Sequence, residues 1–242
     1  PPPPSLRIYE LHVGISLADE AVGTWDAAAA SVLPRVAAAG YTAVLLLGVL
    51  EHGYYASFGY LVTSYLAPSS RFGPPAALQR FIDTAHGLGL QVVLPRSRAL
   101  SPRTQRAPSR ADSDLAHQVL LELVHSHASA NAREGLAQYD TPAAPAAYFL
   151  GGSAGHHAAW GSRLFDYSKV EVVRLLLGSL AWFATAYNID GFRHDAVSTA
   201  LYRHRSIGPP GHFGGGYAQY FGDAADVDAD GLAFLQLANE LA

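Results

Sequence analysis

The segment YTAVLLLGVL, positions 41–50, is a continuous apolar run of the length of a strand. A strand with one solvated face alternates apolar and polar residues, whereas successive apolar residues are typical of a strand buried on both faces of a parallel sheet. Parallel neighbours must be joined by a crossover, which is usually a helix. The run therefore predicts an α/β fold with helices covering the sheet.

The segments around this run have the composition of the other elements. LRIYELHVG (6–14) predicts a strand that leads into a glycine turn, and DAAAASVLPRVAAAG (26–40) predicts a helix interrupted at Pro34 and closed by Gly40. A further helix is expected from about Pro75 to HGLG (86–89). The strand after it is either QVVL (91–94) or QVLLELV (118–124).

The segment YSKVEVVRLLLGSLAWFATAYN (167–188) has the strongest helical pattern in the chain. Its apolar residues have helical spacing, Ser168 and Glu171 predict a capping box, and Asn188 suits a left-handed exit. IDGFRHD (189–195) then predicts a short strand. Strands that alternate with helices in this order indicate a parallel α/β sheet.

Residues 95–114, PRSRALSPRTQRAPSRADSD, contain five arginines with prolines and serines and no periodic pattern. We interpret this segment as a disordered insertion rich in Arg, Pro and Ser. A basic recognition arm is the alternative. The flanking sequences QVVL and QVLL resemble each other, as though the insertion had split one strand.

Composition restricts the partners and the kinds of site. The formal net charge of -4 argues against a general nucleic-acid binder, and no apolar run reaches the ~20 residues of a membrane span. The absence of cysteine rules out thiolate metal sites and disulfides and fits a reducing compartment. The chain contains no methionine, so we expect it to be part of a longer protein.

The strand IDGFRHD ends in two opposite charges. Alternation along a strand places Arg193 and Asp195 on one face and Phe192 and His194 on the other. A buried structural ion pair is one interpretation. In the other, the guanidinium lowers the pKa of Asp195 and keeps this carboxylate ionised, as a nucleophile requires.

Two further segments place polar or aromatic side chains at expected strand ends. ELVHSHAS places Glu122, His125 and His127 at the end of a strand. The two histidines invite a metal site, but no third ligand has a recognisable spacing, so we expect no metal and no cofactor. A neutral imidazole that donates to a substrate hydroxyl fits better. The loop EHGYYASFGY (51–60) is rich in aromatic residues, which either pack together or form a platform for a sugar ring: Tyr54, Tyr55, Phe58 and Tyr60.

Together these motifs resemble the α-amylase superfamily of glycoside hydrolases (family 13), and within it the 1,4-α-glucan branching enzymes. The motifs that carry the resemblance occur in the family's order: IYELHVG, EHGYYASFGYLVTSYLAPSSRFG, AHGLGL, VHSHAS, GLAQYD, SRLFDYSKVEVVRLLL, DGFRHDAVSTALY and YFGDAADVDA. The resemblance implies a (β/α)8 TIM barrel, of which residues 1–242 would form an incomplete catalytic domain with strands one to four and their helices.

The resemblance also implies roles for individual residues. Asp195 matches the catalytic nucleophile of a retaining mechanism, and Arg193 matches the arginine that orients it. His127 and Tyr60 match residues that contact the sugar at the cleavage subsite. Glu122, also assigned to substrate binding, stands where the family has aspartate, and His194 replaces a phenylalanine. The substrate would be an α-glucan such as amylose, amylopectin or glycogen.

The implied reaction cleaves an α-1,4 link and transfers the chain to a 6-hydroxyl. The family's general-acid glutamate is expected beyond LANELA (237–242), so we expect this chain to be inactive by itself. The alternatives are a non-catalytic glucan-binding relative, a truncated gene model, or a hydrolase of the α-amylase or debranching type. The family implies the plastid in a plant or alga and the cytoplasm otherwise.

Overall fold

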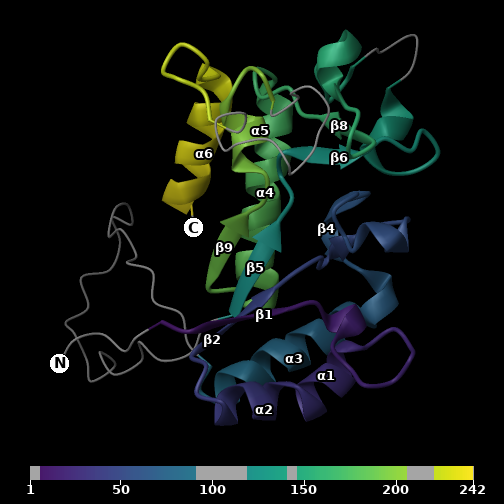
Figure 1. Cartoon of the computed structure of the whole chain (residues 1–242), viewed down its shortest axis with the longest axis vertical. Coiled ribbons are helices and arrows are strands. Elements are labelled where there is room, and N and C mark those ends of the chain that lie inside the picture. Colours follow the sequence, from purple (N-terminus) through teal and green to yellow (C-terminus); the bar gives the residue numbers. More distant parts are fainter. Residues whose placement is uncertain (1–5, 91–118, 141–145, 206–220, 242) are drawn as a thin grey trace, which may run out of the picture.

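The computed structural model describes residues 6–90, 119–140, 146–205 and 221–241. The predicted insertion at 95–114 and the candidate strand at 91–94 lie outside these residues. Within them, the centre of the fold is a parallel sheet with the order β1-β2-β5-β9 (Figure 1). Its strands are β1 (Ile8–Leu11), β2 (Ala43–Leu46), β5 (Val119–Leu123) and β9 (Gly191–His194).

The burial of the strands follows their positions in the sheet. Every residue of the central strands β2 and β5 is buried, whereas the outer strands β1 and β9 contain exposed residues. The apolar run at 41–50 therefore does form a strand buried on both faces, as predicted, although the strand ends at Leu46. Of the two candidates for the next strand, 118–124 is confirmed by β5.

The helices alternate with these strands. Helices α1 (Trp25–Ser31), α2 (Leu33–Ala38) and α3 (Pro75–Gly87) precede β5, and α4 (Val170–Tyr187) lies between β5 and β9. Two more follow β9: α5 (Val197–Leu201) and α6 (Ala229–Leu241). Helix α1 packs against α3, and α4 packs against α6 (Figure 1). The described residues thus form an open α/β sheet, consistent with part of a (β/α)8 barrel.

The interrupted helix and its glycine end are confirmed. Helix α1 ends at Ser31, Pro34 lies in the first turn of α2, and Gly40 has a φ of 78°. Proline is tolerated in a first turn because its missing N–H would have no partner there.

The predicted capping box of α4 is wrong. The helix begins at Val170 with Lys169 as its N-cap, and no side chain caps it. The Ser168 hydroxyl instead donates to Asp166 Oδ1 at 2.6 Å, and Glu171 accepts from Arg174. The left-handed exit is confirmed, because Asn188 has a φ of 53°.

Helix α4 is, among the described residues, the one helix long and apolar enough to span a membrane by length and composition alone. Such a pattern is also that of a core helix. The buried side chains of α4, which include Leu176, Leu180 and Phe183, belong to the main hydrophobic core. Its sequence pattern is accounted for by this packing.

Smaller elements extend beyond the carboxyl ends of the strands. The antiparallel pair β3 (Leu50–Glu51) and β4 (Ser64–Pro68) follows β2, and β6 (His127–Ser129) follows β5 in a sheet ordered β6-β8-β7. The other strands of that sheet are β7 (His156–His157) and β8 (Ser162–Leu164). Short 3-10 helices complete the loops: Val13–Ile15, Tyr55–Ser57, Ser70–Phe72, Gly135–Tyr139 and Gly152–Gly155.

Candidate active site

The candidate active site lies where β5 and β9 end side by side. Glu122 and Arg193 are register partners across these two strands. The backbone N–H of Asp195 donates to the carbonyl of Leu123 at 2.9 Å, so the parallel ladder continues one residue past β9. Functional groups of parallel α/β folds gather at this end of the sheet because the loops diverge there.

Two side chains, those of Arg193 and Tyr60, contact Glu122 or Asp195 at this edge. Arg193 Nη1 forms an ion pair with Glu122 Oε1 and lies 3.6 Å from Asp195 Oδ1. The Tyr60 hydroxyl donates to Glu122 Oε2 at 2.9 Å. The predicted placement of Arg193 and Asp195 on one face is confirmed, and the structure adds Glu122 as the closer partner of Arg193.

The pKa of Asp195 differs from the prediction. Burial raises the pKa of this carboxyl, and this effect exceeds the opposing effects of Arg193 and of a hydrogen bond from the Ala196 N–H. The prediction that Arg193 holds the pKa of Asp195 down is therefore wrong in its net direction. The guanidinium does favour the ionised form, but its nearer contact is to Glu122, and the carboxyl has lost much of its water.

Ala196 is a residue of the site that the sequence did not indicate. It has a φ of 52° and a ψ of 43°, a left-handed conformation that costs a residue with a Cβ ~1–2 kcal/mol. Its N–H donates to the carboxylate of Asp195. Ala196 thus supplies a backbone donor to the candidate nucleophile.

His127 is a buried, neutral ring. Its Nε2 lies 2.9 Å from the Tyr60 carbonyl and its Nδ1 lies 2.9 Å from Ser126 Oγ. A carbonyl only accepts, so Nε2 carries the proton. Burial lowers the pKa of His127 to about 4, which confirms the expected neutral imidazole. Both ring nitrogens bind protein groups here, and contact of His127 with a substrate hydroxyl stays a prediction.

Trp160 lies beside His127 and was not indicated by the sequence patterns. Its ring is 5.0 Å from that of His127, and it stacks on His157 at 3.7 Å. Trp160 is half-buried. Because it lies about 30 residues along the chain from His127, only the antiparallel sheet that contains β6 and β7 brings the two rings together.

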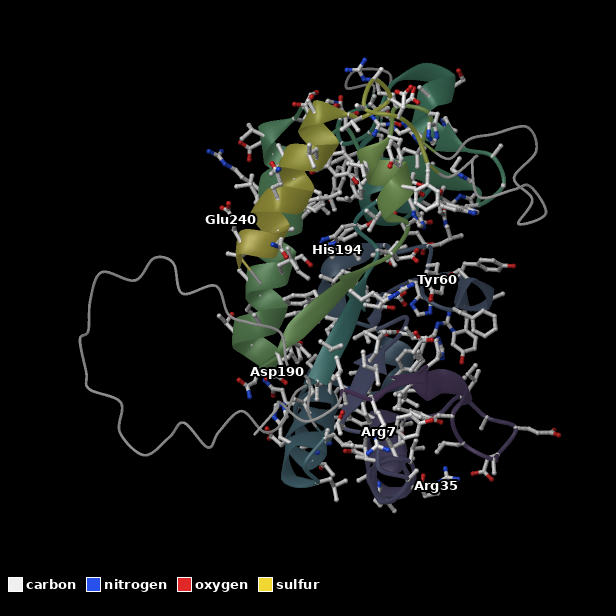
Figure 2. The ribbon with its side chains drawn as sticks, turned by 60° about the vertical axis from the view of Figure 1, so that its left-hand side comes forward. Arg7, Arg35, Tyr60, Asp190, His194 and Glu240 are labelled. Carbon is white, nitrogen blue, oxygen red and sulfur yellow. The ribbon has the colours of Figure 1, made fainter. Side chains whose placement is uncertain are left out.

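His125 and His194 lie on the opposite side of the sheet from this cluster. Their rings are 5.7 Å apart, and both contact Phe234 of α6. Figure 2 shows His194 on the side of the sheet near α6 and Tyr60 on the other side. The expected orientation of His194 toward the helices is confirmed, and its buried Nδ1 has no hydrogen-bond partner.

In the described ranges, no group of three or more His, Cys, Asp or Glu side chains could hold a metal ion. Glu122 and His127 contact Tyr60, whereas His125 enters the helix layer and contacts Phe234.

Of the four aromatic residues in the 51–60 loop, Tyr60 is the one that joins the cluster. Tyr54 and Phe58 are largely exposed, and Tyr55 packs under the Arg71 guanidinium at 4.9 Å. At the end of the loop, the backbone of Gly59 packs directly against the backbone of Gly48. A Cβ on Gly59 would lie 2.4 Å from the Cα of Gly48. This close approach fixes the backbone immediately before Tyr60, whose stacking on a sugar stays a prediction.

The chain is similar in sequence to proteins of known activity. No family model matches the chain. It is 43% identical over 237 residues to a 1,4-alpha-glucan-branching enzyme of Eremothecium gossypii, covering 98% of this chain and 30% of that protein. It is 44% identical over 239 residues to the 1,4-alpha-glucan-branching enzyme of Emericella nidulans, covering 99% of this chain and 30% of that protein.

The fold also matches solved structures. An α-amylase of Geobacillus thermoleovorans superposes with a TM-score of 0.55 at 17% identity, covering 78% of this chain and 40% of the other. That likeness concerns the fold, and it agrees with the partial barrel. The chain spans about a third of the length of the curated relatives that it matches, 30% in each. The identity over nearly the whole chain confirms the resemblance in the motifs: along this length the chain is similar to 1,4-α-glucan-branching enzymes.

Proposed function

We propose that this protein is a glucan-branching enzyme in which Asp195 is the nucleophile. The observation that carries the proposal is the position of Asp195, at the carboxyl end of β9 and on the same face as Arg193, in a chain similar to 1,4-α-glucan-branching enzymes. The substrate would be an α-glucan, because the curated relatives are named for 1,4-α-glucan branching.

The proposed reaction is a double displacement. The ionised carboxylate of Asp195 attacks the anomeric carbon, the α-1,4 C–O bond breaks, and the leaving oxygen takes a proton from a general acid. A glycosyl ester of Asp195 results. A glucan 6-hydroxyl then attacks the same carbon and gives its proton to the conjugate base of that acid. The α-1,6 link forms, and the carboxylate of Asp195 is released.

Glu122 is unsuited to the role of general acid. Its side chain is buried, and its two oxygens accept from Tyr60 and pair with Arg193, an arrangement that stabilises the ionised carboxylate. A general acid must instead hold a proton to donate. We assign that role to another carboxyl group of the protein.

The test is product analysis with the full-length protein and linear amylose. We expect α-1,6 anomeric proton signals to grow in NMR spectra while total reducing ends stay constant. Asp195→Asn should lower the rate by at least ~10³-fold, as removal of a nucleophile does. Asp83→Asn, which changes an exposed aspartate on α3, is the control and should leave the rate unchanged.

Other outcomes would contradict the proposal. A rise in reducing ends without α-1,6 signals would identify a hydrolase. Retention on amylose with neither product would identify a non-catalytic glucan-binding protein. Full activity of Asp195→Asn would show that Asp195 is not the nucleophile.

A further inference from the structure

Glu122 is the most buried charged group at the candidate site, with 1% of its surface exposed. We propose that Glu122 is a positioning residue that holds the Arg193 guanidinium away from Asp195 and so sets the pH at which Asp195 becomes an active nucleophile. The inference rests on the proposed function, since it concerns how the same carboxylate is prepared for attack.

The geometry of Glu122 divides its two oxygens between two partners. Oε1 forms the ion pair with Arg193 Nη1, and Oε2 accepts from the Tyr60 hydroxyl. The same Arg193 nitrogen lies 3.6 Å from Asp195 Oδ1, beyond the usual distance of a direct hydrogen bond. One guanidinium nitrogen thus pairs with two carboxylates, and the carboxylate of Glu122 is the nearer of the two.

The backbone enforces this competition. Glu122 and Arg193 are partners in the register of β5 and β9, so the backbone holds the two residues opposite each other. Asp195 lies beyond the end of β9, with its N–H bonded to the carbonyl of Leu123. The partition of Arg193 between the two carboxylates is therefore fixed by strand register rather than by a mobile loop.

The charges around Asp195 come from several elements. Arg193 on its own strand favours its ionised form, and the Ala196 N–H does the same. Tyr60 from the aromatic loop senses the charges of Asp195, Arg193 and Glu10 of β1. His127 of β6 is neutral, and Glu122 of β5 supplies a buried negative charge. Of the two carboxylates that pair with Arg193, that of Glu122 is thus the nearer.

Neutralising Glu122 should strengthen the hold of Arg193 on Asp195. In Glu122→Gln the competing charge is gone and the guanidinium is free to approach Asp195. Both changes favour the ionised nucleophile at lower pH. We expect the acid limb of kcat/KM for branching by the full-length protein to move to lower pH. The activity at the acid end, relative to the plateau, should rise by about tenfold.

Glu171→Gln is the matched control. It breaks a Glu–Arg pair of the same kind, with Arg174 Nη1 at 2.6 Å, on the exposed face of α4. It should leave the acid limb where it is. If Glu122 were merely structural, Glu122→Gln would lower the plateau and the unfolding midpoint without moving the limb, and that result would overturn the proposal.

Two further measurements keep the test decisive. Glu122→Asp keeps the charge but withdraws it from Arg193 by one methylene. It should therefore move the acid limb in the same direction as Glu122→Gln, but by less. This variant is the substitute if Glu122→Gln does not fold. The Asp195 carboxyl can also be titrated by ¹³C NMR, assigned by its loss in Asp195→Asn. Its midpoint should fall in Glu122→Gln even if the protein branches no glucan, and an unchanged midpoint would overturn the proposal independently of the proposed function.

Discussion

Glu122 and Arg193 stand opposite each other across β5 and β9, and their side chains form an ion pair in which the carboxylate is almost completely buried. Tyr60 adds a hydroxyl donor to the same carboxylate from a loop about 60 residues away in the chain. The contacts link the sheet to the aromatic loop. Because of the ion pair with Glu122, the arginine beside the candidate nucleophile Asp195 is shared between two carboxylates.

Replacing Tyr60 by phenylalanine tests the hydrogen bond to Glu122. The variant leaves a buried carboxylate oxygen without its donor, and we expect the free energy of unfolding to fall by ~1–3 kcal/mol. Urea-induced unfolding measures this loss. Tyr54→Phe is the control, because Tyr54 is 61% exposed, and should have no measurable effect. Equal stabilities of the two variants would show that the Tyr60 hydroxyl contributes nothing.

Replacing Gly59 by alanine tests the closure of the aromatic loop. Gly59 has a φ of 94°, and the added Cβ would lie 2.4 Å from the Cα of Gly48, so the backbone next to Tyr60 must move. We expect a loss of stability of more than ~1 kcal/mol and lower activity. Gly87→Ala in α3 meets nothing within 4 Å and should be neutral or stabilising. Similar unfolding curves for both variants would contradict the account.

Replacing His194 by phenylalanine tests the buried histidine pair. Burial lowers the pKa of His194 in the folded protein, so below the unfolded pKa of ~6.5 the unfolded chain binds more protons and the free energy of unfolding decreases. His194→Phe removes this part of the pH dependence, and it removes a buried nitrogen without a partner.

The expected result is a smaller fall in the unfolding midpoint between about pH 8 and about pH 5 than in the original protein. At neutral pH the variant should be more stable by ~1 kcal/mol, since the unpartnered nitrogen is gone. His125 and His127 also have lowered pKa values and should retain part of the pH dependence. A midpoint that falls as steeply in the variant would contradict the role of His194.

Replacing Arg193 by alanine tests its electrostatic effect on Asp195. The guanidinium favours the ionised carboxylate, so its removal should raise the pKa of Asp195 further. Attack requires the ionised form, and the acid limb of kcat/KM should therefore move to higher pH. Arg174→Ala, which removes an exposed arginine of α4, is the control. A limb that stays in place would show that Arg193 does not act on Asp195 through its charge.

The parts of the fold that sequence could predict are those governed by local patterns. The apolar run at 41–50, the proline and glycine signals at Pro34 and Gly40, and the alternation in IDGFRHD each depend on residues close together in the chain. The capping box failed because Ser168 lies one residue before the N-cap, Lys169, where its hydroxyl and N–H bond to Asp166. Local hydrogen bonds of this kind compete with helix caps.

The contacts of the site could not be read from the sequence because they join distant segments. The register of β5 and β9 decides that Glu122, rather than Asp195, lies nearer to Arg193. The small antiparallel sheet decides that Trp160 lies beside His127. The pKa of Asp195 is raised because burial outweighs the effect of Arg193. The sequence reveals the charged neighbour but not the burial. Sequence patterns indicated Glu122, Arg193 and Asp195 as candidates, but neither their contacts nor the neighbouring Trp160 and Ala196.

The most direct test of the account is to trap the covalent intermediate on the full-length protein. A fluorinated glycosyl fluoride, which forms the glycosyl ester but slows its breakdown, is incubated with the enzyme, and the digested peptides are examined by mass spectrometry. The account predicts one glycosyl group on the peptide that contains Asp195, and its absence in Asp195→Asn. A glycosyl group on another carboxylate, with Asp195 unmodified, would contradict it.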